Sequence, residues 1–233
     1  MGKFINIYQN SDKLPKPKAI LLDWDNTLAD SWKIIHKCLN VAFREMGREE
    51  WSMEEVIKGR EGIHQSLRES FPKIFGADWQ KAKNLYFSAF LDCHLQEICL
   101  LPGALETIKG LRKLDVHIAV VSNKTGIHLR NELKHLGIDQ YFDVVVGATD
   151  AAKDKPFKEP LLFSLEKTLI KEKDFGEVWM IGDSATDIEA AFNTGVIPVL
   201  FGHADVSKYL EKGDIYTINS HPEWHLLIKK LAE

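Results

Sequence analysis

The sequence has no long apolar stretch, few cysteines and no excess of charge of either sign. No apolar run approaches the roughly 20 residues that a membrane-spanning helix requires, and the N-terminal residues lack the apolar core and cleavage site of a secretion signal. The 3 cysteines are too few and too irregularly spaced for a disulfide framework. The 30 basic and 34 acidic residues give a net charge of −4, so there is no basic field for binding nucleic acid. We therefore expect a cytoplasmic protein, a monomer or weak homodimer, that binds neither membrane nor nucleic acid.

Two common kinds of site are also missing from the sequence. No glycine-rich nucleotide loop of the form GxxxxGK[ST], or GxGxxG after a strand, is present. The residues that suggest a zinc site match neither a CxxC nor an HxxxH spacing, and we do not expect them to bind metal; they are His36, Cys38, Cys93, His94 and Cys99.

Most of the 233 residues form short apolar runs that alternate with segments of helical period, after a polar lead-in at residues 1–18. The apolar runs that we expect as strands are 19–22, 116–121, 144–146, 178–181, 196–200 and 215–218. The segments that we expect as helices are 103–114, 125–136, 159–170, 185–194 and a last one from about 222. This alternation is typical of βαβ units and predicts an α/β fold, a Rossmann-like, doubly wound and mostly parallel sheet.

Residues 31–100 break the alternation. They contain four helix-like segments, divided by glycine and proline, and no convincing strand. A crossover connection does not need this length, so we expect a small all-helical cap domain inserted after the first strand. Residues 19–30 and 101–233 would then form the core domain.

Polar residues follow several of the apolar runs. The segments concerned are Asp23-Trp24-Asp25-Asn26-Thr27, Ser122-Asn123-Lys124, Gly182-Asp183-Ser184-Ala185-Thr186-Asp187, and a loop with Lys153, Lys155 and Lys158. Ligands of an open parallel sheet bind beyond the carboxyl ends of its strands, so we expect these side chains to meet at one edge.

Four carboxylates at that edge, those of Asp23, Asp25, Asp183 and Asp187, would repel one another unless a cation neutralises them or one stays protonated. An all-oxygen cluster without histidine or cysteine suits a hard cation, Mg²⁺ before Ca²⁺ or Mn²⁺. A lysine and a hydroxyl beside the ion would complete a pocket for a phosphate group, so we expect a phosphorylated ligand.

The four motifs DWDNT, VSN, the KP-containing loop and GDSATD resemble those of the haloacid dehalogenase superfamily of aspartate-nucleophile phosphatases. They occur in the family's order over residues 19–195, and the helical insertion matches the family's cap. The resemblance implies Mg²⁺-dependent hydrolysis of a small phosphate monoester through a phosphoaspartate. Within the superfamily the sequence is most similar to phosphoglycolate phosphatases, which implies 2-phosphoglycolate as a candidate substrate.

The same resemblance assigns roles to individual residues. Asp23 would be the nucleophile and Asp25 the general acid and base. Mg²⁺ would bind the carboxylates of Asp23 and Asp183 and the backbone carbonyl of Asp25. Asp187 would orient the site through Lys155, without contacting the substrate itself. The residues that would hold the phosphate are Asn26, Thr27, Ser122, Asn123 and Lys155.

Two positions depart from the family pattern. Asn26 stands where many members have glycine, and asparagine is the non-glycine residue that best tolerates a left-handed φ, so the turn can be kept. Lys158 stands where many have proline, which leaves open whether Lys155 or Lys158 enters the site; we favour Lys155 because it directly precedes Pro156.

Substrate choice and reaction type leave alternatives open. We place Gly59-Arg60-Glu61-Gly62 in a substrate-facing loop of the cap, where Arg60 either pairs with an anionic part of the substrate or is an ordinary surface residue. A phosphoglucomutase-type phosphotransferase of the same family and a catalytically silent phosphate-binding regulatory protein are the rival functions. Haloacid dehalogenation is disfavoured because that reaction needs no acid at Asp25.

Overall fold

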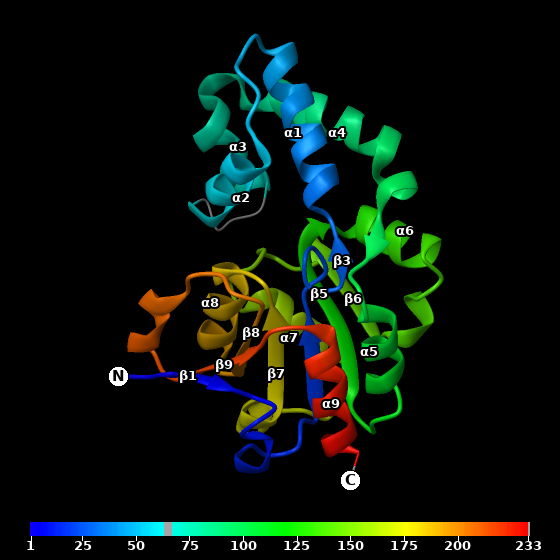
Figure 1. Ribbon diagram of the computed structural model, residues 1–233, viewed down its shortest axis with the longest axis vertical. Helices are drawn as coiled ribbons and strands as arrows, with labels where there is room; N and C mark the ends of the chain where they lie inside the picture. Colours follow the sequence, from blue (N-terminus) through cyan, green and yellow to red (C-terminus); the bar gives the residue numbers. More distant parts are fainter. Residues whose placement is uncertain (63–66, 233) are drawn as a thin grey trace.

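The computed structural model describes residues 1–62 and 67–232, and the side chains of residues 60–62 and 67–69 fall outside this description. Figure 1 shows a core built on a sheet, with a separate group of helices at one end of it. Among the described residues, no helix combines the length and the apolar character needed to cross a bilayer.

The core sheet has seven strands, all paired in parallel, in the order β1-β9-β8-β7-β2-β5-β6. Their bounds are β1 Phe4–Asn6, β2 Ala19–Leu22, β5 His117–Thr125, β6 Val144–Ala148, β7 Val178–Gly182, β8 Ile197–Phe201 and β9 Ile215–Ile218. β2 lies between β7 and β5, and all four of its residues are buried. A central parallel strand is covered on both faces, which is why its sequence is continuously apolar. The predicted fold class is confirmed.

Helices cover both faces of this sheet. They are α5 (Ala104–Leu111), α6 (Gly126–His135), α7 (Glu159–Leu165), α8 (Ala185–Thr194) and α9 (His221–Leu231). Ile20 and Leu22 of β2 share one apolar cluster with α5, α6 and α9, whereas Ala19 and Leu21 share another with α7 and α8. The alternation follows from the two-residue period of a strand, and it leaves the carboxyl ends of the strands open to a ligand.

The described part of the cap contains four α-helices: α1 (Trp32–Glu45), α2 (Met53–Gly62), α3 (Leu67–Phe75) and α4 (Trp79–Glu97). A short antiparallel pair, β3 (Ala29–Asp30) with β4 (Cys99–Leu100), lies where the chain enters and leaves the cap. Figure 1 shows α1 and α4 rising side by side from this point. The helical content of the insertion matches the prediction, and the exact domain boundaries stay a prediction.

Residues 1–18 differ from the expected lead-in because they contribute a strand to the sheet. β1 lies at the edge, with Phe4 opposite Ile215 and Asn6 opposite Thr217. A strand of 3 residues is too short to show an alternating pattern. Its partner lies at the other end of the chain, so no local signal revealed it. The strands β3 and β4 were not predicted either, because two residues are also too few to show an alternating pattern.

Candidate active site

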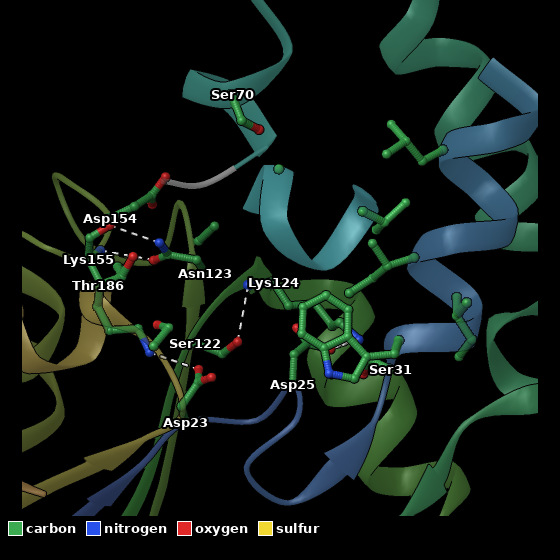
Figure 2. A pocket seen from close by; sticks show the side chains of 18 of the residues that line it. Asp23, Asp25, Ser31, Ser70, Ser122, Asn123, Lys124, Asp154, Lys155 and Thr186 are labelled. Atoms are coloured by element: carbon green, nitrogen blue, oxygen red, sulfur yellow. Dashed lines mark hydrogen bonds and ion pairs between the residues drawn. The ribbon is translucent and has the colours of Figure 1, made fainter. Parts of the chain in front are cut away.

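A buried lysine joins two aspartates at the carboxyl ends of the central strands. Nζ of Lys155 donates to Oδ1 of Asp23 at 2.8 Å, to Oδ1 of Asp187 at 2.6 Å and to the carbonyl of Val121 at 2.6 Å. Figure 2 shows Asp23, Ser122 and Lys155 together, with Asp25 beside them. These bonds join segments that lie 132 and 32 residues apart in the sequence. The predicted convergence of Asp23, Lys155 and Asp187 is therefore confirmed.

Burial and neighbouring charges act in opposite directions on the pKa of Asp23 and of Lys155. Burial raises the pKa of Asp23 to about 6, the carboxylates of Asp187 and Asp25 add to the rise, and Lys155 acts against it. Burial works against the charged form of Lys155, but the attraction of Asp187 and Asp23 outweighs it and raises the pKa of that ammonium. Lys155 therefore stays charged, while Asp23 needs further positive charge to be fully ionised at mildly acidic pH.

Asp23, Asp183 and Asp187 form an acidic cluster. One carboxylate oxygen from each lies within 4.8 Å of the others, and within the described residues no other group of three or more acidic, histidine or cysteine side chains is close enough to hold an ion. An all-oxygen donor set fits a hard cation such as Mg²⁺. Asp23 and Asp183 are two of the three ligands that we predicted. The third, the backbone carbonyl of Asp25, stays a prediction.

Gly182 and Ser184 fix the position of Asp187. Oδ2 of Asp187 accepts from the backbone amide of Ser184 at 3.1 Å and from its hydroxyl at 2.6 Å, which caps the start of α8. A Cβ at Gly182 would lie 2.2 Å from Cγ of Asp187. Glycine is therefore required where β7 ends, because any side chain would push Asp187 away from Lys155.

The loop after β2 turns sharply at Asn26. The φ of Asn26 is 61°, in the left-handed region that we expected asparagine to accept. Its amide N–H donates to the carbonyl of Ala29 at 2.7 Å, and its Oδ1 accepts from the amide of Ser31 at 3.2 Å. Asn26 and Thr27 do not line the cavity described below. Their visible role is to shape the loop, and the phosphate contact assigned to them stays a prediction.

Asn123 acts on Lys155. β5 extends to Thr125, so Ser122 and Asn123 lie within the strand instead of after it. The carboxamide of Asn123 donates to the carbonyl of Lys155 at 2.8 Å and accepts from its amide at 2.9 Å. This pair of bonds fixes the backbone that carries the ammonium. Ser122 is buried and lines the cavity, as its predicted contact with phosphate requires.

The structure settles which lysine enters the site. Lys155 is 2% exposed and lies in the site, whereas Lys158 is an exposed residue that precedes α7. Lys153 is also exposed and forms an ion pair with Glu159 at 3.6 Å. The preference for Lys155 is confirmed.

Lys124 and Glu132 belong to the site as well, although neither was predicted from the sequence. Nζ of Lys124 lies 2.9 Å from Oδ1 of Asp25 and 2.6 Å from Oε2 of Glu132, a fully buried residue of α6. Burial disfavours the charged form of Lys124, but Asp25 and Glu132 together raise its pKa. The position of Lys124 directly after Ser122 and Asn123 was a usable signal, whereas nothing in the sequence near Glu132 indicated its role.

A cavity of about 800 Å³ lies between this site and the cap. The core contributes polar groups that include Asp23, Asp25, Ser122, Lys155 and Asp183. The cap contributes mainly apolar and aromatic side chains, among them Trp32, Trp51, Phe87 and Phe90. A phosphate group would thus bind at the strand ends, and the rest of a substrate would face the cap.

The predicted cap loop is helical. Residues 59–62 form the end of α2, and the side chain of Arg60 lies outside the described residues, so its role stays a prediction. A Cβ at Gly59 would lie 2.7 Å from Cζ3 of Trp51. Gly59, which we placed in a loop, lies in a helix, and the absence of a side chain therefore allows α2 to pack against the Trp51 ring.

The residues that suggested zinc do not gather. Cys38 and Cys93 lie 3.9 Å apart (Sγ to Sγ) inside the cap, and Cys99 is exposed. His94 instead bonds to Glu132, and His36 bonds to the carbonyl of Trp51. Each of these two histidines and two cap thiols therefore has a partner within the protein.

Comparisons with known proteins agree with this geometry. A model of the haloacid dehalogenase-like hydrolase family matches residues 20–200. A phosphoglycolate phosphatase of Chromobacterium violaceum is 27% identical over 221 residues, which cover 91% of this chain and 96% of that protein. The pyrophosphatase PpaX of Listeria monocytogenes is 31% identical over 179 residues, which cover 76% of this chain and 80% of that protein.

Solved structures give the same fold. A haloacid dehalogenase superfamily hydrolase from Ehrlichia chaffeensis is 26% identical, with a TM-score of 0.65 over 94% of this chain and 100% of that one. A haloacid dehalogenase-like family protein from Streptococcus pneumoniae is 21% identical and supports the fold, with a TM-score of 0.75 over 93% of this chain and 97% of that one. The resemblance seen in the four motifs is confirmed, and the chain is an enzyme of the haloacid dehalogenase-like hydrolase family.

Proposed function

We propose that the chain hydrolyses a small phosphate monoester with the help of Mg²⁺, through a phosphoaspartate on Asp23. The observation that carries the proposal is the bond between the buried ammonium of Lys155 and Asp23, beside the acidic cluster with Asp183 and Asp187. Phosphoryl transfer depends mainly on positioning and on stabilising charge spread over the oxygens of the transferred group. A fixed ammonium next to a nucleophilic carboxylate provides both.

The first step forms a bond between a carboxylate oxygen of Asp23 and phosphorus and breaks the bond to the leaving oxygen. Lys155 and the hydroxyl of Ser122 would stabilise the phosphoryl oxygens, and Asp25 would give its proton to the leaving oxygen. In the second step Asp25 takes a proton from water, the water oxygen bonds to phosphorus, and the bond to Asp23 breaks. Inorganic phosphate leaves, and both carboxyl groups return to their initial states.

The carboxylates of Asp23 and Asp183 would hold the Mg²⁺, together with the backbone carbonyl of Asp25. When bound, the ion supplies positive charge that reduces the repulsion between the carboxylate of Asp23 and a phosphate dianion. The raised pKa of Asp23 supports this assignment, because the fold alone leaves that carboxylate short of positive charge.

The names of the relatives guide the choice of substrates. One relative is named a phosphoglycolate phosphatase and another a pyrophosphatase. We propose 2-phosphoglycolate as the first candidate, with the cap forming the wall around the part of the substrate that carries no phosphate.

A panel of phosphorylated metabolites tests the proposal. Purified protein with Mg²⁺ is incubated with 2-phosphoglycolate, pyrophosphate, sugar phosphates and p-nitrophenyl phosphate, and both inorganic phosphate and isomerised sugar phosphate are measured. Release of phosphate that stops on addition of a chelator supports the proposal. Isomerised sugar phosphate without free phosphate would favour a phosphotransferase, and no turnover of any compound would favour a silent binding protein.

A further inference from the structure

Glu132 is a fully buried carboxylate with three hydrogen-bond donors around it. Oε2 accepts from the indole Nε1 of Trp24 at 2.7 Å and from Nζ of Lys124 at 2.6 Å, and Oε1 accepts from Nδ1 of His94 at 3.0 Å. Burial of a carboxylate is strongly unfavourable unless it is well paired, so a side chain held in this way has one well-defined position. The core helix α6 thus provides a fixed negative charge beside the active site.

Lys124 connects this charge to Asp25. Its ammonium lies 2.6 Å from Glu132 and 2.9 Å from Asp25, and its side chain is 9% exposed. The ring of Phe90 in the cap helix α4 lies 5.5 Å from the same ammonium. A lysine side chain in water has considerable rotamer freedom. Here Glu132 and Phe90 restrict it, and the position of the ammonium in turn restricts the carboxylate of Asp25.

Trp24 fixes the backbone of the same loop. It lies between Asp23 and Asp25 in the sequence, its ring is fully buried, and its indole N–H donates to Glu132. Glu132 therefore acts on Asp25 in two ways. Its bond to Trp24 fixes the backbone next to Asp25, and its bond to Lys124 fixes the ammonium that lies against the Asp25 side chain. The proposed nucleophile, Asp23, is paired with a different cation, since Lys155 contacts Asp23 and Asp187.

We propose that Lys124 and Glu132 are positioning residues for proton transfer by Asp25: Glu132 holds Lys124 and Trp24, and Lys124 holds the Asp25 carboxyl group toward the leaving oxygen. The inference rests on the proposed function, because it assigns these residues to the protonation of the leaving group in the first step. Neither residue touches the phosphoryl group in this role. Replacement of Lys124 or Glu132 should therefore impair proton transfer by Asp25 more than nucleophilic attack by Asp23.

Two aryl esters of similar size isolate that effect. Phenyl phosphate and p-nitrophenyl phosphate differ mainly in the leaving group, and phenolate needs a proton more than the weakly basic p-nitrophenolate does. The value of kcat/KM reports the steps up to formation of the phosphoaspartate, so the later hydrolysis, which is common to both esters, does not enter. The ratio of the two kcat/KM values is thus a measure of acid assistance.

We expect Lys124→Met to lower kcat/KM for phenyl phosphate about tenfold more than for p-nitrophenyl phosphate, since a positioned acid contributes roughly a hundredfold or more. Glu132→Gln, which keeps the shape of the side chain, should change the ratio in the same direction by a smaller factor. Lys124→Arg keeps a cation and should restore most of the ratio. A purely structural role would lower both rates equally.

The matched control is Arg130→Gln on the same helix. Arg130 is exposed and pairs with Asp150 at 2.6 Å, away from Asp25, so the ratio should equal that of the wild type. If the wild type hydrolyses both esters and the Lys124→Met ratio is unchanged, the positioning role is wrong while the proposed function stands. If the wild type hydrolyses neither ester with Mg²⁺, the proposed function fails and the inference fails with it. Circular dichroism of Glu132→Gln and Lys124→Arg confirms that the ratios come from folded protein.

Discussion

The imidazole of His221 is bonded to the backbone carbonyl of Thr27, at 2.9 Å from Nε2. A carbonyl only accepts, so Nε2 carries the proton, and Nδ1 accepts from the hydroxyl of Thr107 at 3.1 Å. The ring also stacks on Trp224 with an interplanar angle of 6°. The helix α9 (His221–Leu231) thereby supports the loop that follows β2, at a residue two positions after Asp25.

This contact predicts how the stability of the protein depends on pH. Burial lowers the pKa of His221 from 6.5 to about 4, against the opposite effect of its bond to Thr27. The neutral ring is favoured in the fold, so its contribution is fully present above the unfolded pKa and is lost as the pH falls toward the folded value. We expect the free energy of unfolding to decrease by about 3 kcal/mol over that interval.

Urea denaturation of the wild type and of His221→Phe at about pH 7 and about pH 4.5 measures this contribution. The variant should be less stable at neutral pH, because Thr27 and Thr107 lose a partner, and its stability should change less on acidification. Equal pH dependence in the two proteins would show that another group is responsible.

Asp23→Asn should abolish phosphate release. The amide cannot form the phosphoaspartate, and the bond to Lys155 loses its ionic character. We expect kcat for p-nitrophenyl phosphate to fall by about a thousandfold or more. Asp12→Asn, at an exposed position, is the control and should behave like the wild type. Substantial activity in Asp23→Asn would assign the nucleophile to another residue.

Binding of Mg²⁺ should weaken as the pH falls through about 6. The proton on Asp23, whose pKa is raised to about 6, then competes with the ion for the same oxygens. Calorimetric titration with Mg²⁺ alone should give a dissociation constant about tenfold higher at about pH 5 than at about pH 7.5. Asp183→Asn should weaken binding at both pH values. A dissociation constant that does not vary with pH would place the ion away from Asp23.

Asn123→Ala should reduce activity without unfolding the protein. The substitution removes both hydrogen bonds to the backbone of Lys155, which frees the segment that carries the ammonium. We expect kcat/KM for p-nitrophenyl phosphate to fall about tenfold, since small displacements of a positioned group have effects of this size. Thermal denaturation would show whether the loss comes from the site or from the fold, and unchanged activity would show that Lys155 is held by its side chain alone.

Gly182→Ala should both destabilise the protein and reduce its activity. The added methyl group would lie 2.2 Å from Asp187, so the strand end or the carboxylate must move, at a cost of about 2 kcal/mol. Gly176→Ala is the matched control, because nothing lies within 4 Å of its Cβ position. Melting temperatures of the two variants should differ clearly, and similar values would mean that the Asp187 side chain moves aside easily.

The sequence was informative where chemistry directly follows a buried strand. Asp23 and Asp183 come after continuously apolar runs, so their meeting at one edge could be deduced from the topology of a parallel sheet. Lys155 was identified by the proline after it. In each case a short local pattern carried enough information to place the side chain.

Contacts between distant segments could not be predicted in this way. Glu132 bonds to Trp24, 108 residues before it, and Asn123 bonds to the backbone of Lys155, 32 residues after it. Each depends on how helices and loops pack, and a helical glutamate or a strand asparagine has the same local pattern whether or not it has such a partner. Gly59 was wrongly placed in a loop because glycine serves close packing as well as turns, and only the position of Trp51 shows which applies.

The edge position of β1 has a consequence for synthesis of the chain. Residues 4–6 are synthesised well before their partners at 215–217, which lie 211 residues further along the chain. The inner strands can already assemble while residues 4–6 have no strand to pair with. We therefore expect β1 to dock only after β9 is made, on a sheet whose inner strands have already formed.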